Sequence, residues 1–279
     1  AFNTAGFSIY QDSFCKFSDN ISLNITIICI STLGSLGFFV LFDIYKYYTE
    51  RLNGTKNNKL SVHSRIILIS TITILIVGSI LVFIIEYYGN SAPFKFKLLS
   101  SIFQVSSAST TTGFNSIDIG KMKESNLFLI AIMMFIGAGS GGTGGGIKMT
   151  TLVVTLLSVY AIIRNKNTVN IFKRRLPFEI IRNSFAIFIL SISWVILITY
   201  ILSISENKGF ISLLFETGSA LGTVGLSTGI TADLSSIGKV LITISMFIGR
   251  IGPLGIGISL LKSAEEPGYK YSTTDIFIG

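Results

Sequence analysis

Charged residues are scarce in this chain: they make up 13% of 279 residues, and this excludes most soluble folds, which carry about 25%. Two cysteines and one histidine are too few for a disulfide framework or a clustered metal site. Hydrophobic residues reach 49%, and the mean hydropathy is +0.68. The composition therefore predicts that lipid, rather than water, surrounds much of the folded chain.

Five long apolar runs match the roughly 20 residues that an α-helix needs to cross a bilayer. Four contain no charge and the last contains only Arg250: they are 20–42, 66–85, 125–147, 183–205 and 240–261. Two segments between them, 93–117 and 209–232, begin apolar but end rich in Ser, Thr and Gly. We expect five spanning helices and two incomplete, re-entrant spans.

Lys and Arg concentrate in the loops after the first and third runs, at 43–65 and 164–182, which places these loops and the C-terminal tail in the cytoplasm. The net charge of +8 is thus explained by membrane topology, and we expect no nucleic-acid partner. The sequence predicts a multi-pass protein of the cell membrane, in contact with the lipid bilayer.

An internal repeat organises the chain. The pattern Ala-x-x-Thr-x-Gly occurs at 1–6, 108–113 and 220–225, with glycines 107 and 112 residues apart. The offset of 112 also aligns Phe103-Gln104 with Phe215-Glu216. We predict an all-α polytopic membrane protein built of tandem membrane-pore-membrane repeats with re-entrant pore helices and extended filter strands.

The predicted units are 1–50 (the strand and last helix of one repeat), 51–165 (a complete repeat) and 166–279 (a further repeat and the cytoplasmic tail). The first unit starts at its Thr/Gly strand, so we expect the complete protein to extend upstream by the rest of that repeat and one more.

Non-helical backbone is tolerated at membrane depth only where protein buries it or a wet cavity solvates it. Three Thr/Gly strands therefore predict a shared aqueous path, in which glycines let backbone carbonyls replace the hydration shell of a cation. The alternative is that these glycines only permit close helix packing. The periodic context favours the path.

With these motifs, the chain resembles the potassium-translocating subunit of the Trk/Ktr/HKT superfamily, most closely the Ktr type. The resemblance implies potassium uptake, coupled to or activated by Na⁺, through a pore lined by backbone carbonyls, with no covalently bound cofactor. The implied selectivity filter comprises Asn3, Thr4, Ala5, Gly6, Thr111, Thr112, Gly113, Phe114, Thr223, Val224, Gly225 and Leu226.

A glycine-rich run at 137–146 cannot hold a helix, because each glycine costs about 1 kcal/mol. By the same resemblance it is an intramembrane gating loop, with Gly139, Ser140, Gly141, Gly142, Thr143 and Gly144 as gate residues and Lys148 beside them. Arg250 falls at the equivalent break of the last repeat and is assigned to the gate. The alternatives are a packing seam for the loop and a structural ion pair for Arg250.

Two enzyme motifs fail on their context. Residues 225–229 match G-x-S-x-G and 139–144 match G-x-G-x-x-G, but both lie in apolar segments without the strand that either fold requires. We therefore expect no enzyme activity. The alternatives are a polytopic membrane enzyme, a non-conducting accessory protein and a non-selective cation channel.

The family resemblance implies a homodimer on a cytoplasmic ring of nucleotide-binding regulatory subunits.

Overall fold

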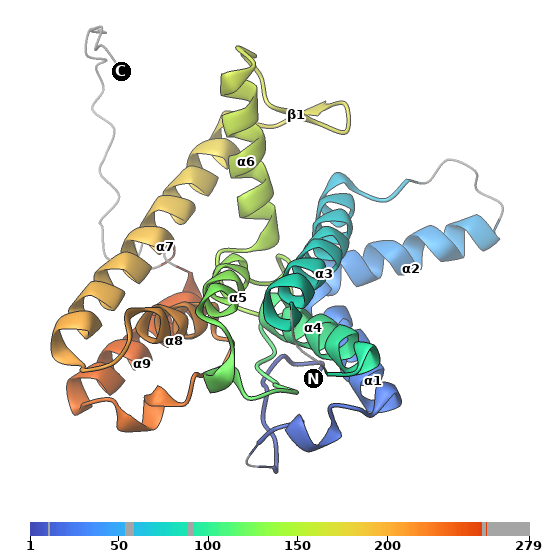
Figure 1. Cartoon of the computed structure of the whole chain (residues 1–279). Helices are drawn as coiled ribbons and strands as arrows, with labels where there is room; N and C mark the ends of the chain where they lie inside the picture. Colours follow the sequence, from blue (N-terminus) through green and yellow to red (C-terminus); the bar gives the residue numbers. More distant parts are fainter. Residues whose placement is uncertain (11, 54–58, 89–91, 253–254, 256–279) are drawn as a thin grey trace, which may run out of the picture.

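The computed structural model describes residues 1–10, 12–53, 59–88, 92–252 and 255, and these are mostly helical (Figure 1). The α-helices are α1 (Ile21–Leu36), α2 (Phe38–Leu52), α3 (Val62–Tyr87), α4 (Phe94–Ser109), α5 (Glu124–Ile136), α6 (Met149–Ile163), α7 (Phe178–Ser205), α8 (Phe210–Gly222) and α9 (Ser236–Ile251). Short 3₁₀ helices are η1 (Cys15–Phe17), η2 (Ile119–Lys121) and η3 (Ile230–Asp233). An antiparallel hairpin pairs β1 (Asn170–Ile171) with β2 (Arg174–Arg175).

Two helices, α3 with 26 residues and α7 with 28, are each long and apolar enough to cross a membrane alone. At 1.5 Å per residue both exceed the roughly 30 Å hydrocarbon core. They confirm the predicted spans at 66–85 and 183–205. The short helices α4 and α8 occupy the two segments expected to be incomplete spans.

The expectation of one continuous span over 20–42 is wrong. The chain bends by 97° between α1 and α2, and the joint is Gly37, whose φ of 94° ends the first helix. A side chain there would also lie 2.7 Å from the carbonyl oxygen of Ser140. Hydropathy could not show this break, because the sequence is apolar on both sides of Gly37, from 20 to 42. The pattern Gly34-x-x-Gly37 was the available signal.

The same kind of break recurs in the other repeats. The helix expected over 125–147 ends as α5 at Gly137 (φ 70°), before the glycine-rich run, and α9 ends at Gly252 (φ 92°). Glycine adopts such φ values without the penalty that other residues pay. The rest of the predicted span 240–261 lies outside the described residues, apart from Gly255.

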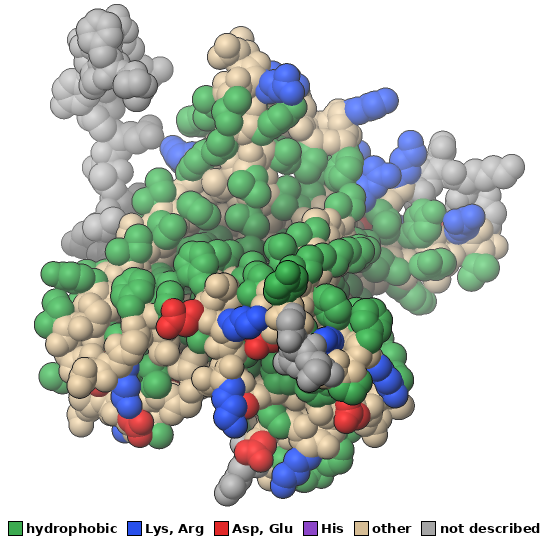
Figure 2. All heavy atoms as spheres, in the orientation of Figure 1, with side chains coloured by type: hydrophobic (Ala, Val, Ile, Leu, Met, Phe, Trp, Pro, Cys, Tyr) green, Lys and Arg blue, Asp and Glu red, His purple; other side chains and the backbone are tan. Residues whose placement is uncertain are grey.

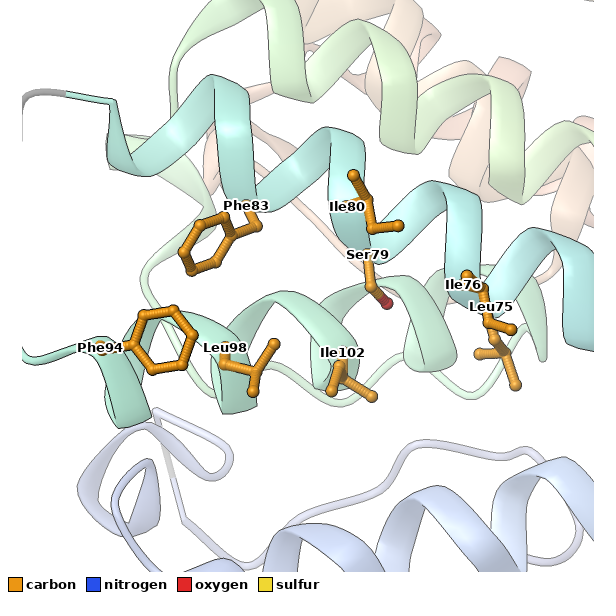
Figure 3. A pocket seen from close by; sticks show the side chains of 8 residues that line it. All are labelled: Leu75, Ile76, Ser79, Ile80, Phe83, Phe94, Leu98 and Ile102. Carbon is orange, nitrogen blue, oxygen red and sulfur yellow. The ribbon is translucent and has the colours of Figure 1, made fainter.

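The main hydrophobic core lies around α4, α5 and α8, at the centre of Figure 1. Its fully buried members include Val105, Ile130, Met134 and Phe215. Between α3 and α4 lies a cavity of about 370 Å³ with walls that are almost entirely hydrocarbon (Figure 3). Its residues are Leu75, Ile76, Ser79, Ile80, Phe83, Phe94, Leu98 and Ile102.

Large apolar side chains cover the outside of the protein. Ile72, Ile80 and Ile84 on α3 and Ile196 and Tyr200 on α7 are each more than half exposed. Figure 2 shows this apolar surface between an upper end that carries Lys and Arg and a lower end that carries both charge signs. This distribution fits a membrane protein whose basic loops face the cytoplasm.

Candidate functional site: three Thr/Gly segments and a glycine loop

At 108–111 and 220–223 the Ala-x-x-Thr pattern is the C-terminal cap of a short helix. In α4 the Thr111 amide donates to the Ala108 carbonyl (3.2 Å) and the next amide, of Thr112, donates to Ser107 (2.9 Å). These two bonds define a Schellman cap, which needs a left-handed residue where threonine stands. The α8 cap is the same, with Thr223 bonded to Ala220 and Val224 to Ser219.

Threonine is an unusual choice for this position. Thr4, Thr111 and Thr223 have φ values of 49°, 57° and 50°, in a region that β-branched residues avoid and glycine normally fills. The cost is about 1–2 kcal/mol at each residue. Two residues later Gly6, Gly113 and Gly225 also have positive φ, of 67°, 87° and 93°. The segments therefore contain left-handed residues at two positions, the threonine and the glycine.

The three segments lie side by side in chain order. A side chain on Gly6 would collide with the carbonyl oxygen of Thr112, and one on Gly113 would collide with that of Val224. Gly225 has nothing within 4 Å of the equivalent position. The segments thus form three sides of a ring, and among the described residues the side next to Gly225 is open.

The middle segment of the three is more buried than the two beside it. In the middle segment Thr111, Thr112 and Phe114 are at most 5% exposed, whereas Asn3 and Ala5 in the first segment and Gly225 in the last are exposed. The Thr111 hydroxyl is buried and has no hydrogen-bond partner in the part of the chain that the structure describes. Buried polar groups are normally paired, so this hydroxyl keeps an oxygen free for a further hydrogen bond or ion contact.

Helices α4 and α8 each also hold the segment that follows their Thr/Gly segment. The carboxylate of Glu216, which is 4% exposed, accepts hydrogen bonds from the Ser227 hydroxyl (2.6 Å), the Thr228 amide (2.9 Å) and the Thr231 hydroxyl (2.7 Å). Its repeat equivalent Gln104, with the side-chain amide oriented to fit, accepts from the amides of Ser116 and Ile117 at 3.0 and 3.2 Å. The repeat alignment paired these two residues but did not predict this role.

The glycine-rich loop is bonded to the break between α1 and α2. The Gly139 amide donates to the Ser35 carbonyl (3.0 Å), the Thr143 amide to Gly34 (3.4 Å), and the Phe38 amide to Gly141 (3.2 Å). Ser140, by contrast, bonds within its own repeat, to the Thr150 hydroxyl (2.7 Å). The loop therefore has a defined conformation fixed by a neighbouring repeat.

Three consecutive loop residues contact the three left-handed threonines. The Thr4 hydroxyl donates to the Thr143 hydroxyl at 3.0 Å. A side chain on Gly144 would collide with the Thr111 hydroxyl, and one on Gly145 with the Thr223 hydroxyl. Residues 143–145 thus lie directly against the threonine end of each of the three segments, which we call the inner end. The sequence had placed Gly145 in the run but had not singled it out.

Arg250 reaches the same loop from the last repeat. Its guanidinium donates to the Thr143 carbonyl at 2.6 Å, and the Lys148 ammonium donates to the Gly144 carbonyl. Gly249 packs on the carbonyl of Leu221, as Gly34 packs on that of Phe2. This correspondence places Arg250 where the earlier repeat has Ser35. The Arg250 side chain of the last repeat and the Ser35 carbonyl of the first repeat thus both hold the loop.

Glu206, which follows α7 at the end opposite the basic loops, fixes the start of α9. Its carboxylate accepts from the Ser235 amide at 3.1 and 3.2 Å and from the Ser235 hydroxyl. The hydrogen bonds from Ser235 hold the pKa of Glu206 below its ordinary value. Nearby, the hydrogen bond and charge of Lys208 lower the pKa of Asp233.

A family model described as "Cation transport protein", TrkH, matches residues 1–271. The chain belongs to the TrkH family of cation transport proteins. This TrkH-family chain is 37% identical over its whole length to the Ktr system potassium uptake protein B of Bacillus subtilis. It is 33% identical over its whole length to the potassium/sodium uptake protein NtpJ of Enterococcus hirae. In each case it covers 62% of the relative, so it spans about three fifths of their length.

The fold is that of a solved structure in the same family. The crystal structure of the potassium transporter TrkH from Vibrio parahaemolyticus matches with a TM-score of 0.75 at 19% identity, over 93% of this chain and 56% of that one. The predicted helical membrane fold of the TrkH-family chain is thereby confirmed.

Proposed function

We propose that the three Thr/Gly segments form the selectivity filter of a potassium uptake pathway. The observation that carries this is the shared backbone: each segment enters through a left-handed threonine and turns again at a glycine, and the segments pack in order around one centre. Strain repeated at three equivalent positions persists where function requires it. Relatives that match the whole chain are named for potassium uptake.

Helix direction favours a cation at this centre. The helices α4 and α8 both end at the left-handed threonine, so their C-terminal ends, with partial negative charge, lie against the filter segments. Carbonyl oxygens of such segments replace the water around a cation, and the number and field of these oxygens favour K⁺ over Na⁺. The unpaired Thr111 hydroxyl offers a further oxygen at the inner end.

The open side next to Gly225 fits one further segment of the same kind. Gly6 and Gly113 each receive a carbonyl from the following segment, so ring symmetry assigns Gly225 a carbonyl from a fourth. Such a segment would also cover the exposed Asn3 and Ala5. Four segments complete the filter of the potassium pathway.

The glycine loop serves as the gate. It lies against the inner end of every segment and is held by hydrogen bonds that can break without disturbing a helix. Arg250 anchors its closed conformation through the Thr143 carbonyl. In the complete subunit, removal of Gly141 and Gly142 should raise flux, because the shortened loop cannot span the inner ends of all three segments.

The remaining parts of the proposal follow from family resemblance. The units 1–50, 51–165 and 166–279 are repeat portions of one subunit, and Na⁺ couples to or activates potassium uptake. The subunit forms a homodimer and docks on a cytoplasmic ring of nucleotide-binding subunits through its basic loops. Crosslinking between loop 164–175 and that ring would test the docking.

Substitution of the filter glycines tests the filter. In the complete subunit, reconstituted in vesicles, Gly113→Ser places a side chain against the Val224 carbonyl at a left-handed φ and should lower the K⁺ over Na⁺ preference by roughly tenfold, or about 1.4 kcal/mol. Gly229→Ser is the matched control, since Gly229 has a φ of 94° and no described residue lies within 4 Å of the added atom. An unchanged ion preference in Gly113→Ser, at equal insertion, would refute the filter assignment.

A further inference from the structure

A second kind of site lies at the cytoplasmic end of the protein, away from the Thr/Gly ring. A cavity of about 230 Å³ separates the end of α6, the β1–β2 hairpin and the start of α7. Its polar wall comprises Lys166, Asn167, Thr168 and Arg175. These groups are donors suited to a phosphate, and two of them are cations.

The other residues that line the cavity are mostly apolar. They include Ile162 from α6 and Phe178, Ile181 and Phe185 from α7. The side chains of Ile162 and Phe178 are 68% and 74% exposed, so the apolar lining continues onto the outer surface of the protein. A cavity that combines two cations with exposed apolar side chains offers what a phospholipid needs: contacts for the headgroup phosphate and a surface for the acyl chain.

The depth of the cavity agrees with this occupant. At 1.5 Å per residue the 28 residues of α7 extend about 42 Å, which exceeds the roughly 30 Å hydrocarbon core. The charge-free part of α7 begins at residue 183, so Phe178 and Ile181 fall where hydrocarbon meets headgroups. Basic segments there are attracted to the anionic lipids of the cytoplasmic leaflet.

Backbone hydrogen bonds hold the two residues that carry these cations at defined positions. Lys166 follows a Schellman cap of α6, in which its amide donates to the Ala161 carbonyl (2.9 Å) and left-handed Asn165 donates to Ile162 (2.9 Å). Arg175 lies in β2, and the hairpin is closed by the bond from the Leu176 amide to Val169 (2.9 Å).

Neither cation is neutralised by an acidic side chain. No ion pair involves Lys166 or Arg175 in the described part of the chain. Glu179 is the single acidic residue between 164 and 182, and it is exposed and does not line the cavity. The fold therefore holds two cations at a cavity without supplying their counter-charge.

We propose that this cavity binds one anionic phospholipid of the cytoplasmic leaflet, whose phosphate contacts Lys166 and Arg175 and whose acyl chain lies against Phe178 and Ile181. The hydrocarbon-walled cavity between α3 and α4 in Figure 3 has no cation on its wall and lacks the headgroup contact. The site lies outside the ion pathway and does not depend on the transport proposal.

Native mass spectrometry of the purified protein tests this proposal, with phosphatidylglycerol and phosphatidylcholine as probes. The unmodified protein should retain one phosphatidylglycerol in preference to phosphatidylcholine. A double variant, Lys166→Ala with Arg175→Ala, should bind phosphatidylglycerol roughly 25-fold more weakly, at about fivefold for each cation. Glycerol phosphate without acyl chains should compete poorly.

The matched control is Lys173→Ala with Arg174→Ala. These two residues belong to the same hairpin, carry the same charge and do not line the cavity, so this variant should bind like the unmodified protein. Equal losses in both double variants would reduce the effect to general charge and overturn the proposal. Full competition by glycerol phosphate would mean a soluble phosphate site instead. Unchanged lipid binding together with lost binding of a cytoplasmic subunit would mean a protein-docking site.

Discussion

Removal of the Arg250 guanidinium should open the pathway. The hydrogen bond to the Thr143 carbonyl, at 2.6 Å, links α9 to the loop residue that also contacts Thr4. A hydrogen bond from a charged group contributes about 1.5–3 kcal/mol, and because Arg250 is exposed we take the lower end. A loss of about 1.4 kcal/mol shifts the closed-to-open ratio of the loop about tenfold.

The assay is ⁸⁶Rb⁺ uptake into vesicles that contain the complete subunit. Arg250→Ala should raise the uptake rate up to about tenfold where the closed loop predominates. Arg250→Lys separates two explanations, because lysine keeps the charge but not the planar fork of donors. High flux in Arg250→Lys supports the anchor, and low flux supports a simple charge barrier. Lys239→Ala is the control, since it removes one exposed cation from the same helix. If Arg250→Ala inserts normally and its uptake equals that of the unmodified subunit, the gating role of Arg250 is refuted.

Three further predictions concern stability and the outer end of the filter. Gly37→Ala should lower the free energy of unfolding by about 1–3 kcal/mol, measured by thermal unfolding, because the added atom lies 2.7 Å from the Ser140 carbonyl at a φ of 94°. Gly252→Ala, which has a similar φ and no neighbour within 4 Å among the described residues, should lose less, and equal losses would contradict the packing argument. Glu216→Ala should leave the Thr228 amide and two hydroxyls without their acceptor. This should lower the free energy of unfolding by about 1–3 kcal/mol for a buried group and weaken the preference for K⁺ over Na⁺. Glu216→Gln should behave like Gln104 and retain most of this ion preference. Ser235→Ala should shift acid unfolding to higher pH: the lowered pKa of Glu206 stabilises the fold fully at neutral pH, and this contribution is lost as the pH falls through the acid range. Ser203→Ala is the control, because it removes an exposed hydroxyl that is bonded within α7, and it should leave the pH midpoint of acid unfolding unchanged. If Ser235→Ala also left this midpoint unchanged, the role of Ser235 would be contradicted.

Patterns that depend on local chemistry were readable from the sequence. The long charge-free runs predicted α3 and α7, because nothing but hydropathy and length decides whether a helix can cross a bilayer. The Ala-x-x-Thr-x-Gly repeats located all three ring segments, since a short helix cap is specified by a few adjacent residues. The glycine-rich run likewise predicted the loop between α5 and α6.

Features that depend on contacts between repeats could not be read in this way. The bend at Gly37 lies against a carbonyl of a neighbouring loop, and hydropathy does not reveal this contact. The left-handed conformation of the three threonines opposes their intrinsic preference, so the sequence pattern did not indicate it. The roles of Gln104, Glu216 and Gly145 arise only when distant segments meet.

The location of bound cations tests the filter most directly. Crystals of the complete subunit grown with Rb⁺ in place of K⁺ can be measured at the rubidium absorption edge, where anomalous difference density reports the ion itself. We predict density enclosed by the segments that contain Gly6, Gly113 and Gly225, on the side of Thr4, Thr111 and Thr223 away from the loop at 143–145. Well-ordered crystals with Rb⁺ density elsewhere, and none within this ring, would contradict the account.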